Sequence, residues 1–183
     1  MSHPAEGKVL VVPCSLRSAS ANRGLARAAA EHLGERAELY LIDDLPLFSE
    51  DHEQDGAEPT EPHGRALREA VRAAGSMLIC TPEYDAYPPA MAINLLNWLS
   101  REPDAPLKGK PVAIAGAAAG FRGARRGQAH LRMQLETIGT RLIEEHFYLQ
   151  IADRFDTAGD LVDADASRRF VEFLDAAFPA ADA

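Results

Sequence analysis

Three short segments of the chain contain residue types that bind phosphate groups and flat rings. The first, residues 15–22, reads Ser-Leu-Arg-Ser-Ala-Ser-Ala-Asn. Its hydroxyl groups, its one guanidinium and the backbone N–H groups of a following helix suit a phosphate dianion. The alternative is a serine-rich loop whose side chains only cap that helix. The chain has no Gly-x-Gly-x-x-Gly and no Gly-Lys-Ser, so an ordinary dinucleotide or nucleoside-triphosphate loop is disfavoured.

The second segment, residues 81–89, reads Thr-Pro-Glu-Tyr-Asp-Ala-Tyr-Pro-Pro. Its prolines lower the entropy cost of holding the backbone towards a ligand, and Tyr84 and Tyr87 offer flat amphipathic surface. The alternative is a stiff surface turn. The third segment, residues 116–120, reads Gly-Ala-Ala-Ala-Gly and lets a flat ring approach the backbone closely. Together the three segments predict a site for a planar cofactor with a phosphate group.

The elements that position these segments alternate between strand and helix. We expect strands at 8–12, 38–42, 76–80, 112–115 and near 141–143 or 147–149, and a glycine- and alanine-rich turn at 116–123. We expect helices at about 20–33, 63–74, 91–99, 124–138 and 166–178. This alternation predicts a parallel sheet with helices on both faces. In a doubly wound sheet the first, third and fourth strands are neighbours, so the three segments should converge at the carboxyl edge of the sheet.

Length and composition limit the class of protein. The 183 residues fit one domain, 1–183, and the 46% hydrophobic and 26% charged residues are ordinary for a globular protein. The net charge of −9 disfavours nucleic acid or an anionic membrane as a partner. No apolar run reaches the ~18–20 residues of a membrane span. The first eight residues lack the apolar core of a signal peptide, and two cysteines suit a reducing compartment, so we expect a cytoplasmic protein.

The motifs in these segments resemble those of the NAD(P)H-dependent FMN reductases, a family that includes quinone, chromate and azo-dye reductases. The family's first loop, roughly Gly-Ser-Leu-Arg-x-x-Ser-x-Asn, is matched by Ser15, Leu16, Arg17, Ser20 and Asn22. Its Pro-Glu-Tyr-Asn loop and the helix after it are matched by Pro82, Glu83, Tyr84, Pro89, Asn94 and Trp98. Its third region is similar at Gly116, Ala117, Gly120, Gly123, Arg126, Gln128, His130, Leu131 and Arg132.

The resemblance implies an α/β fold, the flavodoxin-like three-layer sandwich, with a five-stranded parallel sheet in the order 2-1-3-4-5. It implies bound FMN that passes hydride from NADPH or NADH to a quinone-like or other small acceptor, or the reduction of free FMN. Neither a catalytic side chain nor a metal ion is expected. The residues expected to bind the cofactor are Ser15, Leu16, Arg17, Ser20, Asn22, Pro82, Glu83, Tyr84, Asp85, Ala117, Ala118 and Gly120. The alternative is a non-enzymatic electron carrier or flavin-dependent interaction protein on the same fold.

Two positions depart from the family pattern. Cys14 stands where the family has Gly, which adds a side chain at a tight phosphate turn. Asp85 stands where the family has Asn, which adds a carboxylate near the expected pyrimidine edge of the flavin.

Four further features of the sequence carry structural expectations. The segment 45–62 contains six acidic residues and is expected to be a solvated loop. Trp98 is expected in the core or in a subunit interface, and the alternative is a contact with the cofactor. Arg122, Arg125 and Arg126 are either a solvated helix start or an anchor for the phosphates of NADPH. The helix at 91–99 has more apolar positions than one face needs, which favours a homodimer or a dimer of dimers.

Overall fold

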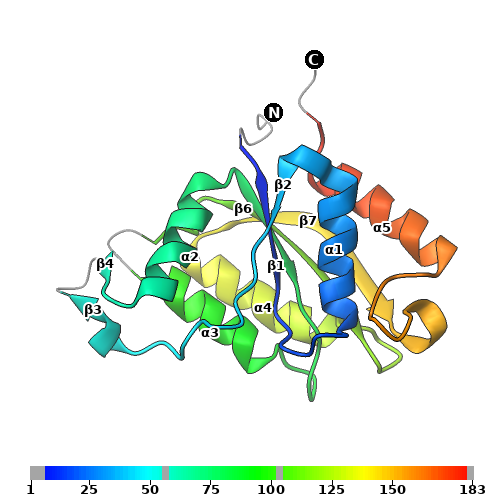
Figure 1. Ribbon diagram of the computed structural model, residues 1–183, viewed down its shortest axis with the longest axis horizontal. Helices are drawn as coiled ribbons and strands as arrows, with labels where there is room; N and C mark the ends of the chain where they lie inside the picture. The colour runs from blue at the N-terminus through cyan, green and yellow to red at the C-terminus, as the bar shows by residue number, and fades with distance from the viewer. Residues whose placement is uncertain (1–6, 55–57, 102–104, 181–183) are drawn as a thin grey trace.

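The main sheet of the protein is parallel and has five strands in the order β2-β1-β5-β6-β7 (Figure 1). The computed structural model describes residues 7–54, 58–101 and 105–180. Every pair of neighbouring strands in this sheet is parallel. The strands are β1 (Val9–Pro13), β2 (Ala37–Leu39), β5 (Ser76–Cys80), β6 (Pro111–Ala118) and β7 (Arg141–Gln150). In chain order of the main strands this is 2-1-3-4-5, which confirms the predicted topology.

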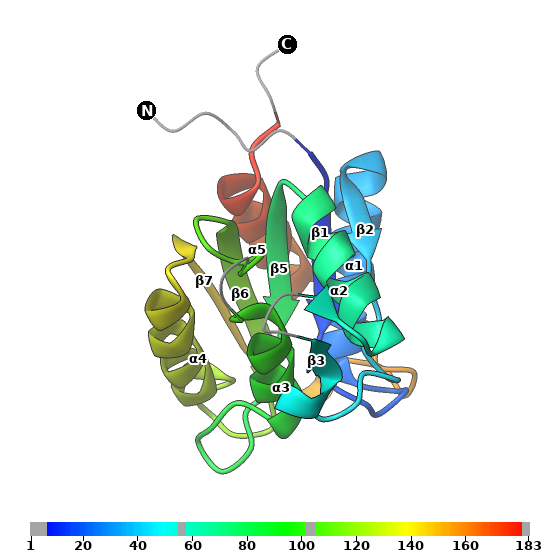
Figure 2. The same ribbon diagram turned by 90° about the vertical axis from the view of Figure 1, so that its left-hand side faces the viewer.

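Helices cover both faces of the sheet and bury it. On one face lie α1 (Ala21–Leu33) and α5 (Ala164–Ala177). Figure 2 shows the other face, which is covered by α2 (Pro62–Ala73), α3 (Ala90–Leu99) and α4 (Arg125–Ile138). Each face has its own apolar cluster, and every residue of β1, β5 and β6 is buried. Among the residues that the structure describes, no helix has both the length and the apolar character needed to span a bilayer.

Local signals in the sequence set the helix ends close to where they were predicted. Ser20 caps α1 by accepting a hydrogen bond from the backbone N–H of Asn22, and Gly34 ends that helix at φ +57°. Gly139 ends α4 in the left-handed conformation at φ +83°. These positions favour glycine because a Cβ is disfavoured at positive φ.

Strand boundaries differ from the prediction in three places. The second strand begins one residue earlier than predicted and is shorter, because only residues 37–39 pair with β1. The fourth strand runs on to Ala118, through positions that were expected to form a turn, because β7 pairs with it as far as Gln150. A Cβ on Gly116 would lie 2.3 Å from the Thr81 carbonyl oxygen, so glycine here permits close packing inside the strand. The last strand includes both predicted candidates, with an irregular register between Val112 and Ile114.

The segment after β2 folds back over α3 as a strap (residues 46–53). The Pro46 carbonyl oxygen accepts hydrogen bonds from the indole N–H of Trp98 at 2.8 Å and from the amide of Asn94 at 2.9 Å. The Asn94 side-chain oxygen in turn accepts from the backbone N–H of Phe48 at 2.8 Å. Trp98 is fully buried beneath this strap, which confirms it as a core residue. The strap includes a 3₁₀ turn, Glu50–His52, and leads into the short pair β3 (Glu53–Gln54) and β4 (Glu58–Pro59).

The prediction of a solvated acidic loop is wrong for two of its acidic residues. The Glu53 side chain is 4% exposed and forms an ion pair at 2.9 Å with Arg68, whose side chain is fully buried. Glu61 caps α2 by accepting a hydrogen bond from the backbone N–H of Gly64. The acidic pattern predicts solvent exposure, because burying a carboxylate has a desolvation cost. The ion pair with Arg68 offsets this cost for Glu53, and the hydrogen bond at the N-terminus of α2 offsets it for Glu61. Asp55, another acidic residue of this segment, lies outside the described residues.

We expect Glu53→Gln to lower the free energy of unfolding by about 3–5 kcal/mol, because it removes the negative charge of a buried carboxylate that forms an ion pair with the buried Arg68 guanidinium. Glu50→Gln is the matched control. Glu50 likewise forms an ion pair with an arginine, Arg101, but the Glu50 side chain is 80% exposed. Its unfolding free energy should change by less than about 0.5 kcal/mol. Urea unfolding of the three proteins measures the difference, and equal losses for both variants would contradict the buried pair.

Candidate functional site

The predicted segments meet at the carboxyl edge of three adjacent strands. β1 pairs with β5 and β5 pairs with β6, all in parallel, so their following loops leave the same edge, at the bottom of Figure 1. These loops are residues 14–20, 81–89 and 119–124. In open α/β sheets this edge is where ligands bind.

The first loop presents unpaired backbone donors next to a helix terminus. Within the part of the chain that the structure describes, none of the backbone N–H groups of residues 15–19 donates a hydrogen bond. They precede the N-terminus of α1, where the helix dipole favours an anion. Ser15 and Ser20 are buried, whereas Leu16, Arg17 and Ser18 are exposed. Arg17 forms no ion pair with any described residue, so its guanidinium is available to an anionic ligand.

Contacts from behind fix the shape of this loop. Arg23 donates from Nε to the Ser15 carbonyl oxygen at 2.8 Å and forms an ion pair with Asp43. On the other side, a Cβ on Gly24 would lie 1.8 Å from the Gly159 carbonyl oxygen, so α1 and the segment after β7 touch through their backbones. These contacts hold the loop without using the backbone N–H groups of residues 15–19.

Asn22 connects the first loop to the third. Its side-chain Nδ2 donates to the Ala117 carbonyl oxygen and its Oδ1 accepts from the Ala117 backbone N–H, both at 2.9 Å. Asn22 is 2% exposed, and its amide satisfies both polar groups of one residue of β6. It therefore positions α1 against β6, a role that the sequence motif did not reveal.

The second loop forms a tight turn that is attached to α4. Tyr84 and Tyr87 exchange backbone hydrogen bonds at 2.9 and 2.8 Å, and Asp85 and Ala86 between them have φ of +50° and +68°. Asp tolerates this left-handed conformation better than most residues do, so Asp85 suits this position of the turn. The Glu83 carboxylate accepts from the backbone N–H groups of Arg126 and Gly127 at 2.7 and 2.9 Å. Glu83 thus caps α4 and holds the turn beside it.

The third loop begins later than predicted, because Ala117 and Ala118 belong to β6 and are buried. Ala119 and Gly120 are exposed, and a Cβ on Gly120 would meet nothing within 4 Å. The exposed backbone at 119–120, directly after Ala118, is therefore the part of this segment that a flat ring can reach.

Both cysteines lie in the core beneath the site and are free thiols. Cys14 packs in the cluster under α2, α3 and α4, whereas Cys80 packs in the cluster under α1 and α5. Their side chains therefore point to opposite faces of the sheet, which does not favour a disulfide. Burial raises the pKa of the Cys14 thiol to about 12 and also raises the pKa of Cys80. Cys14 does not extend into the phosphate turn, contrary to what its place in the motif suggested.

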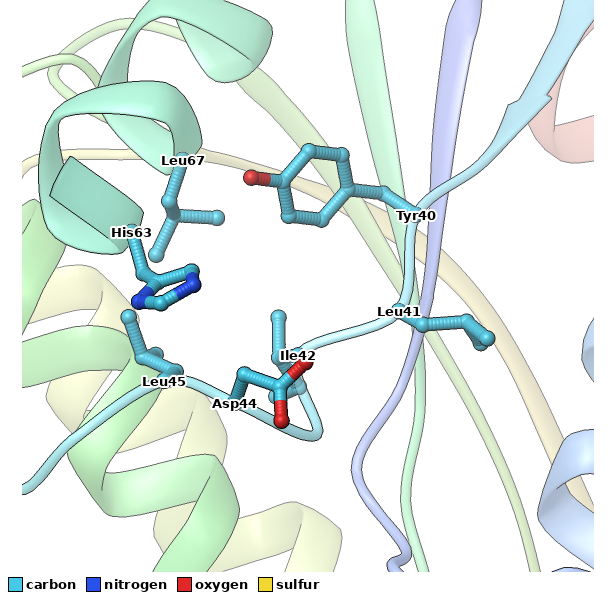
Figure 3. Close-up of a pocket in the computed structure, with 7 residues that line it drawn as sticks. All are labelled: Tyr40, Leu41, Ile42, Asp44, Leu45, His63 and Leu67. Atoms are coloured by element: carbon cyan, nitrogen blue, oxygen red, sulfur yellow. The ribbon is translucent and has the colours of Figure 1, made fainter.

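A small pocket lies away from these loops, between α2 and the segment after β2. Figure 3 shows Tyr40 and Asp44 on one side and His63 and Leu67 of α2 on the other. Its volume of about 70 Å³ is well below the roughly 300 Å³ at which ligand pockets begin, so it does not fit a flavin.

The comparisons with known proteins agree with the site. The sequence pattern of the family described as NADPH-dependent FMN reductase matches residues 7–153. An NAD(P)H-dependent FMN reductase of Pseudomonas aeruginosa is 36% identical over 169 residues, which cover 90% of this chain and 89% of the relative. A quinone reductase of Escherichia coli is 38% identical over 131 residues, 70% of this chain and 69% of the relative. The solved structure of FerB, a flavoenzyme NAD(P)H:(acceptor) oxidoreductase from Paracoccus denitrificans, superposes with a TM-score of 0.81 at 29% identity and covers 94% of this chain and 95% of that one.

The fold and the three loops define a flavodoxin-like protein. The chain belongs to the NADPH-dependent FMN reductase family, as its motifs indicated. It is an oxidoreductase that depends on FMN and on NAD(P)H.

We expect Asn22→Ala to lower the free energy of unfolding by about 1–3 kcal/mol, because it leaves both backbone polar groups of Ala117 without the side-chain partner. Ser18→Ala is the control in the same loop, since Ser18 is exposed and forms no hydrogen bond with any described residue. Chemical unfolding of the FMN-free proteins measures both. Equal stability of Asn22→Ala and wild type would show that the two hydrogen bonds to Ala117 contribute nothing.

Proposed function

We propose that the first loop binds the phosphate of FMN and that the other two loops bind its ring. The observation that supports this most is the set of free backbone N–H groups at residues 15–19 beside the unpaired Arg17. The phosphate would contact Ser15, Arg17 and Ser20, and Leu16 would lie beside it. The ring would lie against the backbones of residues 82–85 and 118–120. When bound, FMN supplies the hydride chemistry, so the protein provides position and electrostatics.

Two of the residues that the motifs predict to bind the cofactor have a positioning role in this proposal. Asn22 uses its whole amide on Ala117, and Glu83 uses its carboxylate on the N-terminus of α4. Asn22 sets the spacing between the phosphate and ring loops, and Glu83 fixes the turn that contains Tyr84 and Asp85. Ala117 likewise contributes through its bonds to Asn22 rather than through an open backbone.

The acceptor that we propose is a quinone or a similar small planar molecule. The relatives named quinone reductase support this class. Exposed flat side chains next to the site support it too: Tyr84 is 57% exposed, Tyr87 59% and Phe121 75%. These rings offer surface on which a planar acceptor can stack. An electron carrier of the same fold would lack a nicotinamide site, so steady oxidation of NAD(P)H with a quinone distinguishes the enzyme from it.

Arg17→Ala should weaken FMN binding by about 1.5–3 kcal/mol, the range for a charge-assisted hydrogen bond. Arg17→Lys should restore only part of this loss, because an ammonium cannot bind two phosphate oxygens in one plane. Quenching of flavin fluorescence on binding gives the dissociation constants. An Arg17→Ala protein that binds FMN as tightly as wild type would exclude this phosphate loop.

We further propose a cytoplasmic protein, one FMN-binding domain over 1–183, that assembles as a homodimer or a dimer of dimers. The excess of apolar positions in the helix at 91–99 is not by itself a reason for a dimer, since Leu95, Leu96 and Trp98 of α3 are buried within the chain itself. Met91 and Ile93 are only half-buried, and Leu47 of the neighbouring strap is 76% exposed. An apolar surface of this kind is typical of a subunit interface.

Sedimentation velocity at micromolar concentration should show a dimer or tetramer. Ile93→Glu should shift the distribution towards monomer, because it would place a charge in the proposed interface. A wild-type protein that sediments as a monomer would refute the assembly without affecting the flavin site.

A further inference from the structure

The guanidinium groups of three arginines beside the third loop have no carboxylate partner among the described residues. Arg122, Arg125 and Arg126 are exposed, and none forms an ion pair with a described residue. Five other arginines do pair with acids, in the ion pairs Arg23–Asp43, Arg27–Asp160, Arg68–Glu53, Arg101–Glu50 and Arg168–Glu172. In a chain with a net charge of −9, three unpaired cations within five positions make a local positive region that attracts anions.

The position of these arginines is unfavourable for the helix that follows them. Arg125 and Arg126 are the first two residues of α4, and no acidic residue occurs in its first turn. Cations at a helix N-terminus are opposed by the helix dipole. Residues that break a local rule without a structural gain are expected at functional sites. The Glu83 carboxylate at this terminus accepts from the backbone N–H groups of Arg126 and Gly127, but it forms no ion pair with a described guanidinium group, so the arginine side chains remain available to a ligand.

Flat rings lie among the three guanidinium groups. Arg122 lies over the Phe121 ring at 4.5 Å, and Arg125 lies over the Tyr148 ring at 5.3 Å. The region therefore combines cations with planar surfaces, next to the backbone at 118–120 where the flavin ring is proposed. A ligand that fits has a flat heterocycle with an anionic group close to it.

We propose that this arginine cluster (Arg122, Arg125 and Arg126) binds the phosphorylated adenosine of NADPH and makes the enzyme select NADPH over NADH. The 2′-phosphate adds a dianion beside the adenine, which matches guanidinium groups interleaved with rings. The inference rests on the proposed function, because it requires the nicotinamide to reach the flavin at the same edge. FMN itself would use Arg17, on a different loop.

An anionic aromatic acceptor also combines a flat ring with a negative charge. The experiment therefore separates binding of NADPH from binding of such an acceptor. The test variant is Arg122→Gln with Arg126→Gln, and the control is Arg169→Gln, an exposed arginine of α5 that forms no ion pair with a described residue. Calorimetry on the FMN-loaded proteins compares adenosine 2′,5′-bisphosphate with adenosine 5′-monophosphate. Anaerobic stopped flow compares flavin reduction by NADPH and NADH without an acceptor. Reoxidation by menadione and by a sulfonated quinone is then measured separately.

The double variant should bind the bisphosphate about 10-fold or more weakly and lose a similar factor in its preference for NADPH. Its affinity for the 5′-monophosphate and its rate of reduction by NADH should be unchanged. Arg169→Gln should behave as wild type in every measurement. The melting temperature of the double variant should equal or exceed that of wild type, because two cations leave a helix N-terminus or its vicinity. A wild type that is reduced equally by NADPH and NADH would overturn the inference and leave the proposed function intact. A double variant slowed only with the sulfonated quinone would also overturn it, in favour of an anionic acceptor. A wild type that retains FMN and binds the bisphosphate but is reduced by neither nucleotide would instead contradict the proposed function.

Discussion

The two hydrogen bonds between the Asn22 amide and the backbone of Ala117 hold the site together. Parallel strands bring the loops after β1, β5 and β6 to one edge, but they do not fix the distance between a helix terminus and a neighbouring strand. The Asn22 amide fixes it by joining the first turn of α1 to β6. Arg23 and the Gly24–Gly159 contact then support the loop without using its backbone N–H groups at residues 15–19.

Much of the fold could be predicted from the sequence because its signals are local. Buried β-branched strands, caps such as Ser20 and stops such as Gly34 each act within a few residues, and their alternation restricts the sheet to a parallel one. The strand order and the identity of the cofactor came from the family motifs, which the family pattern and the 36% identical relative confirm. The length of a strand depends on its pairing partner as well as on its own residues. The end of β6 at Ala118 therefore depended on its pairing with β7.

The parts that could not be predicted depend on contacts distant in the sequence. The acidic composition of residues 45–62 indicates solvent exposure, yet Glu53 is buried because Arg68 lies opposite it. The motif presents Asn22 and Glu83 as ligand-binding residues, whereas their side chains bond to other elements of the protein. In both cases the residue type was informative, but its partner became known only from the fold.

The central claim is that one edge of the sheet binds the phosphate and the ring of FMN through separate loops. It is tested most directly by incubating the FMN-free protein with FMN or with riboflavin, which lacks the phosphate, and recording the visible absorbance of the protein fraction after gel filtration. The account predicts that FMN remains with the protein in equimolar amount and that riboflavin is largely lost. Equal retention of both, or of neither, would contradict it.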